Sequence, residues 1–403
     1  MKCRFTGQDI PTVHSFGMQP IANGFLKDPN ITDEYFFKMD VAVNLDNGLF
    51  QLVKQPNPEQ MFHENYAFFS RTSNFMVDHF NNVAQEILGI LSKNKLPGKE
   101  FVVEIGSNDG VMLEHIVKSN IGCLGIEPSK NVAEESEKYG VTTINEFLSS
   151  TTAEVVSQDY GLADVVYAAN VFCHIPDIND LAESCNKLLK DKGYLIFEDP
   201  YLLEVLKKTS YDQIYDEHVY LFSATAVREV FKKYDLTLVD CKELNTHGGS
   251  MRYYLQKNSN AKESKNLSSI LDDEINFGIK TSQAYENFSK NCSLSREIFR
   301  DKLFEAKRNG QRIIGYGATS KSTTILNYCD VGNELIDFIT DTTPTKINKF
   351  TPGKHIPVKA YENFFPYPDL AVLFAWNHEK EIIQKESAFI ASGGRFITHL
   401  LNN

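Results

Sequence analysis

The chain has 403 residues, of which 42% are hydrophobic and 12% aromatic, so it can bury more than one hydrophobic core. Its formal net charge of -12 argues against nucleic acid or an anionic membrane as the main partner, and a small molecule is the expected ligand. The N-terminus lacks the apolar core of a signal peptide, and no later stretch is long and apolar enough to span a membrane, so we expect a cytoplasmic protein.

Residues 1–75 are rich in Asn, Gln and Pro and contain short strand-like runs such as FFKMDVAV and LFQLV. No long helical period extends over them, so we expect a small, irregular N-terminal domain. The seven cysteines of the chain are scattered and never spaced C-x-x-C, which is typical of reduced thiols rather than of a disulfide framework.

Residues 76–257 combine an amphipathic helix, FMVDHFNNVAQEILGIL, with alternating strand and helix patterns. The first four strands are continuous and rich in Val and Ile, as parallel strands covered on both faces should be. Only NTHGGS separates the last two, which is too short for a crossover helix, so these should pair antiparallel. This doubly wound α/β sheet with a terminal hairpin is the arrangement of class I methyltransferases. The predicted strands are 101–106, 123–128, 164–170, 194–200, 236–244 and 251–257.

Residues 258–310 are polar and then helical, and we interpret them as a helical connector that ends at Gly310. Residues 311–403 repeat the α/β pattern and predict a second, C-terminal Rossmann-like domain. The apolar face expected on the connector helix consists of Leu294, Ile298, Phe299 and Leu303. The strand-like runs of the C-terminal unit are 312–318, 335–341, 369–377 and 394–400.

The stretch VVEIGSNDGVML places Glu104 at the end of the first predicted strand and two glycines directly after it. Glycines are needed in any such turn, but an NAD fingerprint would read G-x-G-x-x-G and bind a pyrophosphate. This loop begins instead with an acid suited to the cationic aminoacyl end of S-adenosylmethionine. Glu127 ends the next strand, where a carboxylate can accept hydrogen bonds from both ribose hydroxyls. The further candidate cofactor contacts are Gly106, Asn108, Gly110, Asn170 and Phe147, the last as a cover for the adenine.

Two segments that follow strand ends carry histidines, ANVFCHIPD with His174 and YDQIYDEHVYLFS with His218. Tyr215 and Glu217 flank His218, and a histidine beside an acid and a phenol is typical of proton-transfer sites. A lone histidine among apolar residues is more often a satisfied core group, so that alternative stays open for His174.

Seven segments, in order, resemble the nucleotide-sugar C-methyltransferase family that makes branched deoxysugars. The resemblance covers nearly the whole chain and implies an N-terminal zinc-binding module, a middle S-adenosylmethionine domain and a C-terminal Rossmann-like domain. It also implies the reaction, in which C3 of a nucleotide-linked 4-keto-6-deoxy sugar is deprotonated and then methylated. The segments are EIGSNDG, GIEPSKNVAEESEKYG, ANVFCHIPDINDL, IYDEHVYLFS, HGGSMRYYL, GYGATSKSTTILNYC and PGKHIPV.

The resemblance also implies roles for single residues. His218 would be the base that takes the C3 proton, Glu217 would orient or polarise it, and Tyr215 and His174 would lie against the sugar oxygens. Candidate substrate contacts are Tyr66, Asn23, His247, Arg252, Gly317 and Lys321, with Lys321 near the diphosphate. Tyr66 and Asn23 could instead pack a domain seam, and His247 and Arg252 could only close the hairpin.

The sequence departs from the family at the zinc module, which normally has two C-x-x-C pairs. Cys3 is kept, but Thr6, Asn44 and Asn47 occupy the other ligand positions. One cysteine cannot hold a tetrahedral zinc ion, so we expect none, unless Cys3 acts with His14 or His63. Three functional alternatives stay open: an epimerase or isomerase, a non-catalytic nucleotide-sugar-binding protein, and an O- or N-methyltransferase.

Overall fold

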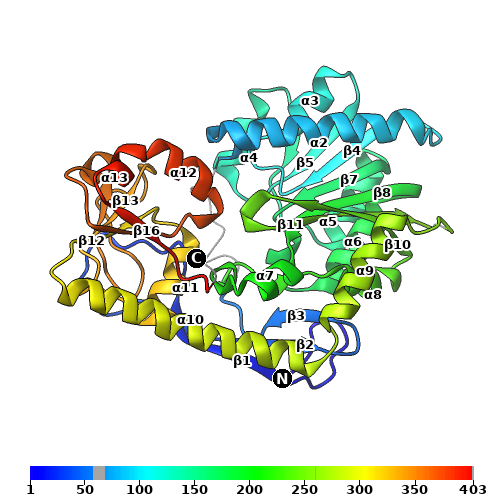
Figure 1. Cartoon of the computed structure of the whole chain (residues 1–403). Coiled ribbons are helices and arrows are strands. Elements are labelled where there is room, and N and C mark those ends of the chain that lie inside the picture. The colour runs from blue at the N-terminus through cyan, green and yellow to red at the C-terminus, as the bar shows by residue number, and fades with distance from the viewer. Residues whose placement is uncertain (58–68, 259, 402–403) are drawn as a thin grey trace.

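The computed structural model describes residues 1–57, 69–258 and 260–401. Their strands form three sheets of four, seven and five strands. In Figure 1 the seven-stranded sheet and its helices lie on the right, the five-stranded sheet on the left, and the four-stranded sheet along the bottom. The three sheets therefore correspond to three regions of the molecule that meet near its centre.

The seven-stranded sheet has the order β10-β11-β8-β7-β4-β5-β6. Its strands β4 to β8 are parallel, whereas β11 pairs antiparallel with both β8 and β10, as the short NTHGGS connection predicts. The class I methyltransferase topology predicted from the sequence is thus confirmed. The strands are β4 (Phe101–Ile105), β5 (Gly122–Ile126), β6 (Thr143–Ile144), β7 (Ala163–Ala169), β8 (Leu189–Pro200), β10 (Leu236–Leu244) and β11 (Ser250–Lys257).

Helices cover both faces of this sheet, which explains why its strands are apolar without alternation. Val102 of β4 packs with Phe80 of α2 and Ile116 of α3 on one face. The next residue, Val103, belongs to the core on the opposite face, with Val156 of α5. The helices of this region are α2 (Asn74–Lys93), α3 (Leu113–Lys118), α4 (Lys130–Glu137), α5 (Ser150–Asp159), α6 (Ile178–Leu188), α7 (Leu202–Lys208) and α8 (Ala224–Lys232).

The N-terminal region is more regular than the sequence predicts. It forms an antiparallel sheet of β1 (Thr12–Pro20), β2 (Phe36–Asn44) and β3 (Leu49–Leu52). Two register irregularities interrupt the pairing of β1 with β2, so the alternation that would have revealed β1 is broken. A fourth strand, β9 (Tyr220–Leu221), comes from the middle of the chain and pairs with β3. The segment that carries His218 is thereby joined to the N-terminal sheet.

The C-terminal region is a fully parallel sheet of order β14-β13-β12-β15-β16, as a Rossmann-like domain requires. The sequence predicts all of these strands except β14, which has three residues. The strands are β12 (Ile313–Tyr316), β13 (Ile339–Asp341), β14 (Val358–Ala360), β15 (Leu370–Leu373) and β16 (Arg395–Ile397). The helices are α11 (Ser320–Cys329), α12 (Glu379–Lys385) and α13 (Ser387–Ala391).

Two helices, α9 (Lys265–Phe277) and α10 (Ser282–Arg308), link the two larger sheets. The predicted apolar face of α10 is half wrong, because Leu294 and Ile298 are 47% and 38% exposed. The buried face instead runs along Cys292, Ser295, Phe299, Leu303 and Ala306. In Figure 1, α10 (yellow) runs beneath both halves of the molecule, so it acts as a brace between them.

Candidate active site

The loop after β4 turns sharply, and its glycines are required by its geometry. Gly106, Asn108 and Gly110 have φ angles of 66°, 48° and 70°, in the left-handed region. A Cβ added to Gly106 would lie 2.3 Å from the Cγ2 atom of Val171, and one added to Gly110 would lie 2.9 Å from the Cβ of Ser136. The loop can therefore adopt this course only with glycine at both positions.

Two carboxyl groups flank this loop and differ in their hydrogen bonding. Glu127 accepts hydrogen bonds from the backbone amides of Asn108 (3.0 Å) and Ser129 (2.8 Å), one on each oxygen. Each oxygen keeps a lone pair that a ribose hydroxyl can use. Glu104 is buried, and its Oε2 atom has no hydrogen-bond partner among the described residues. Burial, followed by the charges of Asp109 and Glu127, raises the pKa of Glu104 well above its usual value.

This pair of acids fits S-adenosylmethionine better than a dinucleotide. A buried carboxyl group with one unpaired oxygen becomes a stable carboxylate beside a cationic amino group, whereas a pyrophosphate would keep it protonated. Asn145 donates to the carbonyl oxygen of Glu127 at 2.8 Å, which brings the segment before Phe147 next to the ribose position. The Phe147 side chain is 46% exposed and offers apolar surface there. Asn170 follows β7 with a left-handed φ of 55°, and its amide donates to the carbonyl oxygen of Glu198.

His218 and His174 lie together at the carboxyl edge of the same sheet. Their rings stack with centroids 5.3 Å apart. The Nδ1 atom of His218 lies 2.7 Å from the carbonyl oxygen of Gln213, and a carbonyl can only accept, so Nδ1 carries the proton. The hydroxyl of Tyr215 lies 2.8 Å from Nε2 and therefore donates to it. The ring thus presents an unprotonated Nε2, the form that a general base needs.

Burial, followed by the neighbouring His174, lowers the pKa of His218 well below its usual value. Burial also lowers the pKa of His174 to about 4. Both imidazoles are consequently neutral near pH 7 in the free protein.

Glu217 makes no hydrogen bond to the His218 ring, contrary to the orienting role predicted for it. Its carboxylate accepts from the side-chain amide of Asn23 at 2.7 Å, and both nitrogens of His218 are bonded to other groups. Glu217 therefore does not orient the imidazole by a direct hydrogen bond; the carbonyl oxygen of Gln213 does. Asn23 in turn accepts from the hydroxyl of Ser320 at 2.9 Å. The candidate residue Asn23 thus joins the segment that carries Glu217 and His218 to the start of α11.

Among the described residues, Cys173, His174 and His218 have nitrogen and sulfur atoms within 4.8 Å of one another, a spacing compatible with a metal ion. Both nitrogens of His218 are already hydrogen-bonded. Burial and the adjacent Asp199 raise the pKa of the Cys173 thiol well above its usual value, which opposes the thiolate that a metal needs. The donor set therefore fits an imidazole base better than a metal centre.

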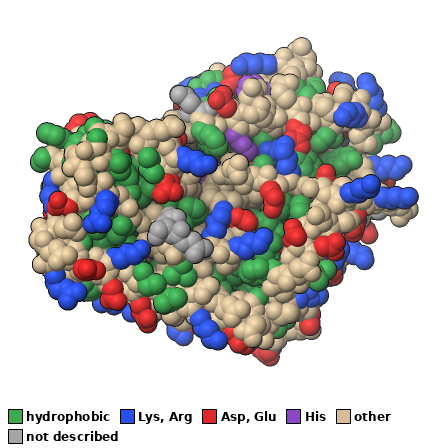
Figure 2. Space-filling view, viewed as in Figure 1, with side chains coloured by type: hydrophobic (Ala, Val, Ile, Leu, Met, Phe, Trp, Pro, Cys, Tyr) green, Lys and Arg blue, Asp and Glu red, His purple; other side chains and the backbone are tan. Residues whose placement is uncertain are grey.

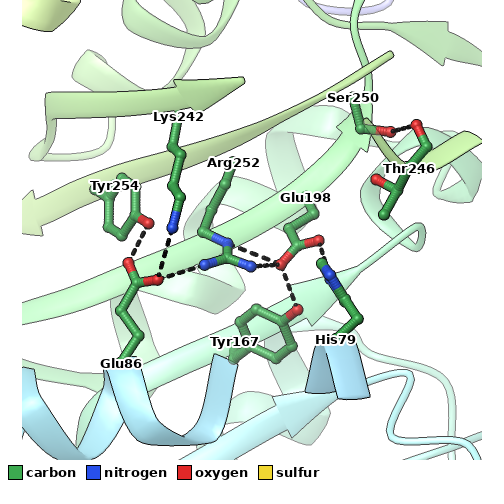
Figure 3. A network of polar contacts seen from close by, with 9 residues as sticks. All are labelled: His79, Glu86, Tyr167, Glu198, Lys242, Thr246, Ser250, Arg252 and Tyr254. Carbon is green, nitrogen blue, oxygen red and sulfur yellow. Dashed lines mark hydrogen bonds and ion pairs between the residues drawn. The ribbon is translucent and has the colours of Figure 1, made fainter. Parts of the chain in front are cut away.

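Arg252 lies in a buried charge network, not in an open cleft (Figure 3). It pairs with Glu198 at 2.7 Å and with Glu86 of α2 at 2.5 Å. Glu198 also binds His79 and the hydroxyl of Tyr167, each at 2.8 Å, so it does not contact His218. The structure thus supports the alternative in which Arg252 fastens the hairpin. One signal for this network was overlooked, since positions 79 and 86 are seven apart and share one helix face.

The remaining substrate candidates that the structure describes already form hydrogen bonds with neighbouring protein groups. Lys321 is buried and donates to the carbonyl oxygen of His247 at 3.2 Å. Burial lowers the pKa of both side chains, that of His247 to about 3. The amide of Gly317 donates to Thr340, and that of Ala318 to the carboxylate of Asp341, so this loop offers fewer free amides than a phosphate loop. Tyr66 lies outside the described residues.

Comparison with known proteins decides the family. The chain is 31% identical over 400 residues to the C-methyltransferase NovU of Streptomyces niveus, covering 98% of this chain and 94% of that protein. The chain belongs to the C-methyltransferase family. Family profiles described as "C-methyltransferase C-terminal domain", "Methyltransferase domain" and "Putative zinc binding domain" match residues 245–400, 77–240 and 3–62 of this C-methyltransferase.

More distant similarities cover less than half of this C-methyltransferase. A ubiquinone biosynthesis O-methyltransferase of Actinobacillus pleuropneumoniae is 32% identical over 114 residues, which is 26% of this chain and 47% of that protein. The magnesium protoporphyrin IX methyltransferase of Synechocystis PCC 6803, solved with SAH, is 15% identical with a TM-score of 0.36, covering 45% of this chain and 84% of that one. The latter likeness is too weak to carry an argument. Together with the acids at the first loop, the family makes this enzyme an S-adenosylmethionine-dependent C-methyltransferase.

Three of the family's four zinc-ligand positions, Cys3, Thr6 and Asn44, lie together in this C-methyltransferase and are joined by hydrogen bonds. Hydrogen bonds from Thr6 and Asn44 outweigh burial and lower the pKa of Cys3. Asn44 also donates to the hydroxyl of Thr6 at 3.3 Å, and Asn47 accepts from the amide of Leu49. His14 binds Ser289 and Tyr328 through its two nitrogens instead, and His63 lies outside the described residues.

Two observations bear on the expected partners. Within the described part of the chain, no helix is both long and apolar enough to cross a bilayer. Figure 2 shows basic and acidic side chains interspersed over the visible face, without a large area of either charge.

Proposed function

We propose that this C-methyltransferase removes the C3 proton of a nucleotide-linked 4-keto-6-deoxy sugar and methylates the resulting enolate carbon, with His218 as the base. The observation that supports it most is the unprotonated Nε2 of His218, fixed by the carbonyl of Gln213 at 2.7 Å. The sugar substrate follows from the family resemblance. A nucleotide-activated deoxysugar is thus the proposed partner.

The base is weak for a carbon acid. An imidazole has a pKa near 6.5 in water, and each pKa unit separating it from the carbon costs about 1.4 kcal/mol. Burial lowers the pKa of His218 further, so the developing enolate must be stabilised by donors. Tyr215 is suited to this role, because its hydroxyl must leave Nε2 when that atom takes the proton and can then donate to the substrate oxygen.

The burial of the site from water strengthens the stabilisation of the enolate. His218 and Glu217 are each 6% exposed, so few waters compete for the enolate oxygen. His174, stacked on His218, is placed to contact the same sugar. We assign Tyr215 and His174 to the sugar oxygens and leave His218 as the proton acceptor.

The methyl donor would be held by the loop after β4. S-adenosylmethionine, when bound, supplies a methyl group on a sulfonium centre that a carbon nucleophile can attack. Glu104 would bind its amino group and Glu127 its ribose hydroxyls, on a loop whose course requires Gly106 and Gly110. The carboxyl ends of β4, β7 and β8 lie on one edge of the sheet, which brings donor and base together.

The C-terminal region is proposed to help hold the nucleotide diphosphate through Lys321 and Gly317, together with His247 from the turn of the β10–β11 hairpin. Lys321 is the cationic group of this set, and it would exchange its bond to the His247 carbonyl for the diphosphate. Asn23 would lie beside the sugar through its contacts with Glu217 and Ser320.

The proposal is tested by incubating the protein with methyl-labelled S-adenosylmethionine and dTDP-, GDP- and CDP-linked 4-keto-6-deoxy sugars. We expect label on C3 of one of them. His218→Asn should lower kcat by about 10²- to 10⁴-fold. His115→Asn, on α3, serves as the matched control and should retain full activity.

Other outcomes would replace the proposal. Label on an oxygen or a nitrogen would make the protein an O- or N-methyltransferase. Exchange of the C3 hydrogen with deuterated solvent, without methyl transfer, would favour an epimerase. Tight binding of nucleotide sugar with neither reaction would indicate a non-catalytic binding protein.

A further inference from the structure

The segment that carries His218 is held by the C-terminal region at its first residues. The indole Nε1 of Trp376 donates to the Oδ2 atom of Asp212 at 2.6 Å. The Nε2 atom of His399 lies 3.0 Å from the other carboxylate oxygen. The side chains of Asp212 and His399 are 0% and 1% exposed, so this contact is formed entirely inside the protein.

Asp212 is ionised in this environment. Burial would raise the pKa of Asp212, but the nearby His399 and Lys321 and the Trp376 bond together lower it below its usual value. A buried carboxylate that loses one of its partners is strongly destabilised, so its position is fixed by the groups that surround it. Both Trp376 and His399 belong to the C-terminal sheet region, more than 150 residues away in sequence.

From Asp212 the contacts continue to the base through the next residue. The carbonyl oxygen of Gln213 accepts the Nδ1 proton of His218, and the Gln213 side-chain amide donates to the carbonyl of His247. One residue further, the carbonyl oxygen of Ile214 accepts from the hydroxyl of Thr324 on α11 at 2.9 Å. The residues on both sides of Gln213, Asp212 by its side chain and Ile214 by its carbonyl, are thus anchored to the C-terminal region.

Steric contact fixes the indole from its other side. Gly248, in the turn of the β10–β11 hairpin, lies so close that an added Cβ would be 2.3 Å from the indole ring. The ammonium group of Lys321 lies 5.5 Å from the centre of the same ring. Trp376 therefore has little freedom to turn away from Asp212.

We propose that Trp376 and Asp212 are positioning residues that fix the tautomer of His218, through the Gln213 carbonyl, so that Nε2 stays free to accept a proton. This inference rests on the proposed function of His218 as the base. If the carbonyl turned away, Nδ1 would lose its acceptor, and the proton could reside on Nε2 instead, where it blocks catalysis. The C-terminal region then contributes to deprotonation itself as well as to substrate binding.

The test compares Trp376→Phe, which keeps the ring but removes the donor, with Glu381→Gln, a control on the exposed surface of α12. We expect Trp376→Phe to lower kcat by about 10²-fold, the cost of a misplaced catalytic group, with both KM values unchanged. Nitrogen NMR of histidine-labelled protein should show His218 protonated on Nδ1 in the wild type and the control, and a mixture of tautomers in Trp376→Phe.

Asp212→Asn is the second variant, and it tests the same contact if Trp376→Phe fails to fold. It has nearly the same shape as the wild-type side chain and leaves the single tryptophan of the chain in place, so the fluorescence of Trp376 reports whether the variant is folded. We expect a smaller shift of tautomer and a smaller fall in kcat than in Trp376→Phe, because the amide oxygen can still accept from the indole.

Wild-type kcat with an unchanged tautomer in either variant would overturn the inference. A fall in kcat that is matched by a lower melting temperature, with His218 still protonated on Nδ1, would overturn it as well, since the contact would then be merely structural. The NMR measurement needs no substrate. If the wild type transfers no methyl group, the proposed function fails, while the tautomer still decides this inference.

Discussion

At the scale of single residues, the chemistry of the site depends on a backbone atom. His218, Tyr215 and His174 can be found in the sequence because histidine and tyrosine side chains are recognisable there. The carbonyl of Gln213, which fixes the tautomer of His218, has no sequence signature because every residue has one. The adjacent acid Glu217 therefore looked like the orienting group, although it faces Asn23.

Three of the family's zinc-ligand positions lie together in this protein, although only one of them is a cysteine. Cys3 lies with Thr6 and Asn44 in a set of hydrogen bonds where the family has thiolates. Cys3 is buried, so its packing survives the change of chemistry. The hydrogen-bonding side chains at this module could be predicted, because Thr6 and Asn44 can be read directly at the ligand positions of a short motif.

We expect purified wild-type protein to contain no stoichiometric zinc by elemental analysis. The triple variant Thr6→Cys, Asn44→Cys, Asn47→Cys should bind about one zinc ion per chain, because it restores thiolates at all four ligand positions of the family and four thiolates suit this ion. Substituting serine for Cys3 in the triple variant is the control and should reduce zinc binding sharply. Zinc in the wild type at one equivalent would contradict the expectation.

At the scale of secondary structure, strands with local signals were predicted and strands with distant partners were not. The buried parallel strands β4, β5, β7 and β8 appear where their continuous apolar runs lie. By contrast, β9 has two residues and pairs with β3, about 170 positions earlier, so no local pattern identifies it. The face of α10 was misjudged because its exposed side includes apolar residues that a periodicity argument assigns to the core.

The turn after β4 requires glycine at position 106, and this requirement can be tested. Gly106→Ala forces a Cβ into Val171 in a backbone region that costs an alanine about 1–2 kcal/mol. We expect a loss of stability larger than this strain, together with weaker S-adenosylmethionine binding, measured by urea denaturation and titration calorimetry.

Gly161→Ala is the matched control for this turn. Gly161 has a φ of 90° but open space around its Cβ position. This variant should lose only the strain energy of about 1–2 kcal/mol and keep its affinity for the methyl donor. Equal effects on donor binding in both variants would show that the turn has no special role.

At the scale of the whole molecule, the three sheets meet around the base-bearing segment. The N-terminal region contributes the amide of Ala22, which binds Asp216, and the side chain of Asn23. The C-terminal region contributes Thr324 and Trp376. Such contacts between distant parts of the chain could not be predicted, because they depend on how finished domains dock.

One contact between the N-terminal sheet and the C-terminal half should be sensitive to pH. His14 of β1 binds Ser289 of α10 and Tyr328 of α11, and burial lowers its pKa to about 4. The unfolded chain takes up this proton near pH 6.5, the folded protein only near pH 4. The contribution of neutral His14 is therefore complete above about pH 6.5 and is lost as the pH falls towards about 4.

We expect the stability of wild type relative to His14→Gln to fall by about 1–2 kcal/mol between pH 7 and pH 4.5, since glutamine does not titrate. Urea denaturation of both proteins at a series of pH values measures this difference, and the comparison cancels the buried carboxyl groups that titrate oppositely. A constant difference across this range would show that His14 titrates normally in the folded protein.

The contacts that Trp376 and Thr324 make with the segment before His218 also limit how this enzyme can be rebuilt. A chimaera that takes its last third from a relative, in order to accept another nucleotide, would replace Trp376 and Thr324 while keeping the stretch they fasten. The two parent proteins must then have matching residues at these contacts. Specificity in this family should therefore change only when the residues on both sides of a contact are exchanged together. Chimaeras with mismatched contacts should be folded but inactive.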